Sequence, residues 1–128
     1  MGTEATVWLD FAKQDLDVAR HLNTAFYPRP LEIVCYHCQQ AAEKAIKAVI
    51  ISLGSPGGLP KRHDLSFLLD QIHHMIPVSD TIYDCADALS PYGVAARYPN
   101  EMDLEPRHAD LAVEQAATIY EWAVQSVK

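Results

Sequence analysis

The sequence predicts an all-α fold, an up-and-down antiparallel bundle of four to five helices. Apolar residues recur every three or four positions through most of the chain, which is the period of an amphipathic helix. No segment alternates apolar and polar residues as a half-buried strand does. The length of 128 residues suits one core, so we expect a single helical domain over residues 1–128.

The first predicted helix covers about Glu4–Asn23, and the second follows a break at Tyr27–Pro30. Pro30 suits the first position of a helix, where the N–H that proline lacks has no partner. Gly54 suits the end of the second helix. Apolar stripes define both helices: Ala5, Trp8, Leu9, Ala12, Leu16 and Ala19 in the first, and Leu31, Val34, Cys35, Cys38, Ala41, Ala42, Ala45, Ile46, Val49 and Leu53 in the second.

The remaining helices are marked by their caps. Asp64 is a good N-cap for a third helix that runs to Ile76, before Pro77. Ser79 can cap a fourth, shorter helix that bears Ile82, Tyr83, Ala86 and Leu89. The stretch from Ser90 to Glu105 has no helical period, and Pro106 then opens a last helix that continues almost to the C-terminus.

The composition indicates a folded, acidic protein. Hydrophobic residues make up 49% of the chain and charged residues 21%, which is the balance of a globular domain. Ten basic residues against seventeen acidic ones give a formal net charge of −7. This charge excludes a general basic surface as the route to nucleic acid but leaves room for a local positive pocket.

The chain shows no sign of export or membrane insertion. Its best apolar run, around Ala45–Leu53, is interrupted by Lys47 and is too short for a bilayer. The first residues lack the basic head and apolar centre of a secretory signal. Three cysteines are an odd number for a disulfide framework. We therefore expect a cytoplasmic protein with reduced thiols.

The cysteines and histidines do not form a metal motif. Cys35 and Cys38 both lie in the apolar stripe of the second helix, and no second ligand pair follows at a suitable spacing. His73 and His74 are adjacent, so on a helix they point about 100° apart. No glycine-rich phosphate loop and no Gly-x-Ser-x-Gly turn is present. We therefore predict neither a metal nor a cofactor.

The polar face of the second helix permits two interpretations. Tyr36, Gln40, Glu43 and Lys47 project within about 60° of one another at 100° per residue. They could form a solvated face with a Glu43–Lys47 ion pair, which contributes about 0.3 kcal/mol. They could equally line a polar groove or a partner surface.

Asp15 is unusual because it projects toward the apolar side of the first helix, beside Trp8 and Leu22. A carboxylate in that position needs a charged or hydrogen-bonding partner to offset its desolvation. We expect Asp15 to have a structural role, with a cation such as His63 or Lys44 as its partner.

Four segments then resemble one known family. Ala12–Ala19 reads A-x-x-D-L-x-x-A, and Cys35–Ala48 reads C-Y-H-C-Q-Q-A-A-E-K-A-I-K-A. Lys61–Leu65 contains R-H-D-L, and Tyr92–Pro99 ends in R-Y-P. In this order and at this spacing the segments resemble the HEPN family (higher eukaryotes and prokaryotes nucleotide-binding).

The resemblance implies an all-α bundle that commonly forms homodimers, in a prokaryotic cytosolic protein often encoded beside a minimal nucleotidyltransferase. Many family members are metal-independent endoribonucleases that act as toxins or defence effectors. Their active site pairs an Arg with a His that follows after about four to six residues. In such a site the His would handle the proton of the 2′-hydroxyl while the Arg steadies the phosphate.

This chain lacks that spacing. Ten residues separate Arg97 from His108, and seven separate Arg29 from His37. The resemblance therefore favours the R-Y-P-bearing branch, a binding or interaction module paired with a nucleotidyltransferase in a toxin–antitoxin-like system. The alternative is a ribonuclease with an irregular site, formed by Arg97 and either His108 or His37. A structural dimer without a ligand is a third hypothesis.

In the favoured interpretation the ligand is a nucleotide, RNA or the partner protein. Arg97 and Tyr98 would contact phosphate and base, while Tyr36, Gln40 and Lys47 would form the wall of the site. Arg97 could instead form a salt bridge within its own loop, to Asp103 or Glu105.

Overall fold

The computed structural model describes residues 3–54, 59, 64–95 and 103–127. Every regular element among them is helical, as the apolar periodicity predicts, and strands are absent from these ranges. The elements are α1 (Glu4–Ala25), α2 (Leu31–Ser52), α3 (Leu65–Asp70), α4 (Asp80–Leu89), α5 (Tyr92–Ala95) and α6 (Pro106–Ser126).

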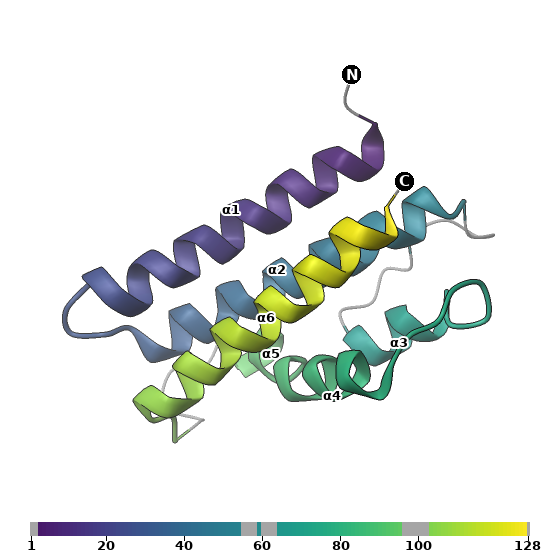
Figure 1. Cartoon of the computed structure of the whole chain (residues 1–128). Coiled ribbons are helices and arrows are strands. Elements are labelled where there is room, and N and C mark those ends of the chain that lie inside the picture. Colours follow the sequence, from purple (N-terminus) through teal and green to yellow (C-terminus); the bar gives the residue numbers. More distant parts are fainter. Residues whose placement is uncertain (1–2, 55–58, 60–63, 96–102, 128) are drawn as a thin grey trace.

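Helix α2 lies at the centre of the bundle (Figure 1). Helix α1 runs antiparallel to α2, and α6 runs parallel to α2 along another side of it. The short helices α3 and α4 cover a further side and return the chain to the start of α6. The fold is therefore the expected antiparallel bundle, with one leg divided into short pieces.

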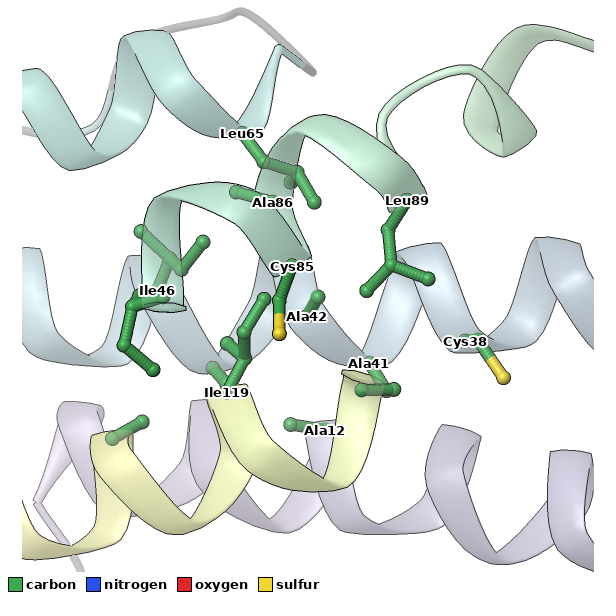
Figure 2. Packing of buried hydrophobic residues seen from close by; sticks show 14 of the residues in the cluster. Ala12, Cys38, Ala41, Ala42, Ile46, Leu65, Cys85, Ala86, Leu89 and Ile119 are labelled. Atoms are coloured by element: carbon green, nitrogen blue, oxygen red, sulfur yellow. The ribbon is translucent and has the colours of Figure 1, made fainter. Parts of the chain in front are cut away.

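The central position of α2 follows from its composition. Thirteen of its 22 residues are buried, so it is apolar on more than one side. Small residues such as Ala41 and Ala42 allow neighbouring helices to come close. Figure 2 shows Ile119 of α6 and Leu89 of α4 pointing toward this part of α2. No helix in the described ranges is long and apolar enough to cross a membrane.

Caps account for where most helices begin. Thr3 precedes α1 and accepts a hydrogen bond from the backbone N–H of Thr6. Asp64 accepts from the N–H groups of Ser66 and Phe67 at the start of α3. Ser79 accepts from Ile82 at the start of α4. The predicted caps at Asp64 and Ser79 are therefore confirmed.

Two segments differ from the sequence-based expectation. Helix α3 ends at Asp70 and does not reach Ile76, because the N–H groups of Gln71 and Ile72 bond three residues back and tighten the chain into turns. Helix α5 is a single turn inside the stretch expected to be irregular. Its Gly93 lies so close to α2 that an added Cβ would be 2.8 Å from Cδ of Gln39.

Candidate functional site

A row of polar side chains runs along α2 inside the protein. Nε2 of Gln40 donates to Oε1 of Gln39 at 2.7 Å, and Nε2 of Gln39 donates to Oε1 of Glu43 at 3.1 Å. Nζ of Lys47 donates to Oε2 of Glu43 at 3.0 Å. The exposed fractions of Gln39, Glu43 and Lys47 are 0%, 5% and 9%. The Glu43–Lys47 ion pair is present, but both residues are buried, so the interpretation of this side of α2 as a solvated face is wrong for them.

Neighbouring helices cover this row. The ammonium of Lys47 lies 5.8 Å from the ring centre of Trp8 on α1, a favourable cation–π distance. Gly93 of α5 lies against Gln39, where the absent side chain makes room for the close approach. Lys47 therefore faces Glu43 and Trp8, and its charge is compensated within the protein.

A second polar cluster lies between α1 and α2 and is more accessible. Oδ2 of Asp15 accepts from Nζ of Lys44 at 2.6 Å, and Oδ1 of Asp15 lies 3.0 Å from Nδ1 of His37. The Asp15 side chain is 14% exposed, against 28% for His37 and 30% for Lys44. Asp15 thus holds two donor groups at the surface, one on each carboxylate oxygen.

Among the described residues, His37 forms its hydrogen bond through Nδ1, and its side chain is 28% exposed. Because Nδ1 of His37 faces a carboxylate, the hydrogen bond favours the tautomer with the proton on Nδ1. Nε2 is then an acceptor when the ring is neutral and a donor when it is protonated. The Tyr36 ring stands edge-on to His37, with centroids 5.7 Å apart. The imidazole is therefore oriented from two sides.

The sequence indicated Lys44 as a partner of Asp15 but did not indicate His37. The signal that could have found it is spacing, since His37 and Lys44 lie seven residues apart and share one face of α2. Tyr36 and Gln40 are half-buried on the same helix. Arg97, Tyr98 and His63 lie outside the described residues.

Other Arg and His side chains considered for a ribonuclease site have structural contacts. Nδ1 of His108 accepts from the backbone N–H of Glu105 at 2.8 Å, as part of the cap of α6. Arg29 pairs with Asp110 at 3.0 Å. Nε of Arg107 pairs with Oε1 of Glu105, the residue considered as a partner of Arg97, at 3.3 Å.

The cysteine thiols are buried and unreactive. Burial raises the pKa of Cys35 to about 11 and that of Cys38 to about 12, and it also raises the pKa of Cys85. These thiols stay protonated near neutral pH and are poor nucleophiles and metal ligands. In the described part of the chain no group of three or more His, Cys, Asp or Glu could hold a metal ion. The absence of stoichiometric zinc stays a prediction, tested by elemental analysis.

The protein is a small all-helical domain, and its accessible polar cluster lies between α1 and α2. The family model of the HEPN domain matches residues 5–127. The chain belongs to the HEPN family.

Two solved structures share the fold. The archaeal HEPN homologue ST0689 is 25% identical, with a TM-score of 0.77 over 99% of this chain and 100% of that one. The protein TT1696 from Thermus thermophilus is 22% identical, with a TM-score of 0.82 over 98% of this chain and 99% of that one. A search of the curated proteins gives no match.

Proposed function

We propose that the protein is a binding and interaction module of the HEPN family, associated with a nucleotide and paired with a minimal nucleotidyltransferase in a toxin–antitoxin-like system. In this proposal it acts as a cytoplasmic homodimer. The observation that carries the proposal is the Asp15 cluster, in which one carboxylate holds His37 and Lys44 at the surface of an otherwise acidic chain.

The cluster has the chemistry that an anionic group requires. Lys44 keeps two N–H donors beyond the one given to Asp15, and protonated His37 offers Nε2–H. A phosphate that accepts from both gains charge-assisted hydrogen bonds. In the proposal Arg97 adds a bidentate fork, while Tyr98 and Tyr36 offer rings to a base.

The buried row on α2 has a supporting role in this proposal. Gln40 is held by Gln39, which in turn bonds Glu43. The Glu43–Lys47 pair fixes the turn of α2 that follows Lys44. We propose that Gln40 borders the ligand directly, and that Lys47 positions the wall of the site from beneath.

Co-expression with the protein encoded beside this chain tests the proposal. We expect a nucleotidyltransferase to co-purify with the wild type, together with a bound small molecule that mass analysis identifies as a nucleotide. The Lys44→Ala variant should lose the small molecule, whereas Lys13→Ala should keep it, since Lys13 makes only an exposed pair with Asp17. A purified chain that binds neither partner nor nucleotide would contradict the proposal.

A metal-independent endoribonuclease is the second candidate, and the Asp15–His37 contact favours it. A carboxylate that orients an imidazole prepares Nε2 to take a proton from a 2′-hydroxyl. In this case expression of the chain alone should arrest growth. RNA should be cleaved in the presence of a chelator, and His37→Ala should abolish the cleavage. An intact RNA substrate after incubation with the wild type would exclude this candidate.

A further inference from the structure

The Asp15 cluster holds two basic side chains with a single carboxylate. Nζ of Lys44 donates to Oδ2 of Asp15 at 2.6 Å, and Nδ1 of His37 lies 3.0 Å from Oδ1 of the same residue. The Asp15–Lys44 pair is electrically neutral, so the net charge of the cluster depends on His37. It is zero when the imidazole is neutral and positive by one unit when the imidazole is protonated. The protonated cluster therefore lacks one negative charge.

The surroundings of the cluster make this missing charge important. Lys13 and Arg20 also share one carboxylate, that of Asp17, but all three side chains are more than half exposed, so water and salt screen their charges. The three side chains of the Asp15 cluster are at most 30% exposed. Screening is weaker at such partly buried groups, and an anion that binds there supplies the missing charge.

The protonation state of His37 decides which kind of group its outer nitrogen can bind. Because Nδ1 faces the carboxylate of Asp15, the neutral ring carries its proton on Nδ1 and a lone pair on Nε2. That lone pair repels a phosphate oxygen, whereas the Nε2–H of the protonated ring donates to it. The neutral ring suits a hydroxyl group, and the protonated ring suits a phosphate.

The charged groups around His37 act in opposite directions. Among the described residues, Asp15 of α1 favours the protonated ring, and Lys44 of α2 opposes it. Tyr36 of α2 is the other titratable side chain in contact with the ring, and it stands edge-on to it. A phosphate at Nε2 adds a second negative charge on the side away from Asp15. This charge tips the balance toward the protonated ring.

We infer that His37 takes up a proton when the cluster binds a phosphate group, so that binding is coupled to pH. This rests on the proposed function and adds how its site is regulated. The affinity should be highest at mildly acidic pH and fall as pH rises, because histidines lose their charge between pH 5 and 8. An ammonium group stays charged over this range, so we expect the contribution of Lys44 to be the same throughout.

The coupling also separates the two candidate functions. A general base requires the neutral ring with a free lone pair on Nε2, whereas the phosphate contact requires a proton on the same nitrogen. Uptake of a proton on binding therefore supports the binding module and not the ribonuclease with His37 as its base.

Nucleotide titrations at several pH values test the coupling. The probes are the four common ribonucleoside 5′-monophosphates, and the one that the wild type binds most tightly is carried from pH 6 to pH 8. His37→Gln keeps a polar side chain that cannot become charged. The affinity of the wild type relative to this variant should fall by about fivefold or more across the series, because a charge-assisted hydrogen bond is lost. The second ionisation of a phosphate monoester also lies in this range, but it affects both proteins alike and cancels from the ratio.

A control variant and two further measurements identify the proton. His21→Gln replaces an exposed histidine of α1 and should keep the pH dependence of the wild type. Calorimetry in two buffers of different ionisation enthalpy should show that the wild type takes up more protons on binding than His37→Gln, by up to one per site. Nitrogen NMR of the wild type at pH 7 should show that added nucleotide raises the protonated fraction of His37. This last measurement needs no variant, so it decides the question even if His37→Gln folds poorly.

The outcomes separate the coupling from nucleotide binding itself. A wild type that binds a nucleotide with the same proton uptake and the same pH dependence as His37→Gln overturns the coupling and leaves the proposed nucleotide association standing. Binding without any change in the NMR signals of the His37 ring nitrogens has the same meaning. A wild type that binds none of the four nucleotides even at pH 6 overturns the nucleotide association, and the coupling with it.

Discussion

Asp15 occupies a structural position at the centre of the candidate site. Its carboxylate is mostly withdrawn from water, so each oxygen needs a partner. Lys44 and His37 supply these partners from α2, and the same contacts hold both groups at the surface. The cost of burying the charge is therefore offset by contacts that also orient the candidate ligand-binding side chains.

Replacing Asp15 should destabilise the fold. Asp15→Ala leaves Lys44 and His37 without their acceptor, and we expect a loss of about 1–3 kcal/mol in the free energy of unfolding. Asp17→Ala on the same helix is the control. Its ion pair with Lys13 is exposed, so we expect a change of less than about 0.5 kcal/mol. A melting temperature of Asp15→Ala within a degree of the wild type would show that the carboxylate is effectively solvated.

The buried thiols should make stability depend on pH in the alkaline range. Burial raises the pKa of Cys35 and Cys38 above the ordinary value of 9.0, to about 11 and about 12. The unfolded chain releases these protons first, so stability is full below pH 9 and falls as pH rises toward 11. Urea unfolding from pH 8 to 10.5 should show this decline, and Cys35→Ala with Cys38→Ala should reduce it. The remaining decline comes from Cys85, Tyr83 and Tyr92, whose pKa values burial also raises. Equal slopes for the two proteins would contradict the assignment.

For single residues, the helical period of the sequence predicted correctly which side of a helix faces the core. The position of Asp15 on the apolar side of its helix predicted a partner, and Lys44 is one. The burial of Lys47 could not be predicted, because helical projection gives direction but not which neighbouring helix covers a face. Trp8 of α1 lies over Lys47, and α5 lies against Gln39 in the same row.

At the scale of elements, α2 depends on a buried ion pair. Glu43→Ala would leave the ammonium of Lys47 uncompensated beside Trp8, and we expect a loss of about 3–5 kcal/mol in unfolding free energy. Glu43→Gln combined with Lys47→Met removes both charges, keeps an acceptor for Nε2 of Gln39 and should recover most of the loss. Chemical denaturation of the three proteins measures this. A double variant as unstable as Glu43→Ala would show that the charge balance is not the cause.

The contact between α5 and α2 requires a glycine. Gly93→Ala would place a Cβ 2.8 Å from Cδ of Gln39, within the buried row. We expect a loss of about 1–3 kcal/mol from overpacking. In a Gln39→Ala background the same substitution should cost much less, because the obstructing side chain is gone. Additive effects in this double-mutant cycle would argue against the close contact.

Element boundaries were predictable where a cap coincided with an apolar period. This was so for the start of α3 at Asp64, for α4 after Ser79 and for α6 at Pro106. The end of α3 was not predictable, because Ile72 is buried and continues the apolar pattern although the chain has already turned. The spacing of apolar residues predicts which residues are buried. It does not predict where the hydrogen bonds of a helix end.

For the whole molecule, the excess of acidic residues limits how phosphate can bind: ten Lys and Arg stand against seventeen Asp and Glu. The net charge of −7 disfavours unspecific binding to phosphate. In the proposal, affinity for a nucleotide comes from local donors, namely Lys44, His37 and Arg97. We therefore expect the protein to prefer a nucleotide over bulk nucleic acid.

Titration of common nucleotides against the wild type, Arg97→Ala and Arg97→Lys is the most direct test of the proposed function. We predict that the wild type binds a nucleotide and that Arg97→Ala weakens binding by roughly 10–150-fold, the range for about 1.5–3 kcal/mol from a charged hydrogen bond. Arg97→Lys should restore only part of the affinity, since an ammonium offers no bidentate fork. Thermal melts of all three should agree. Unchanged affinity in Arg97→Ala, or a melt that collapses in that variant, would contradict the account.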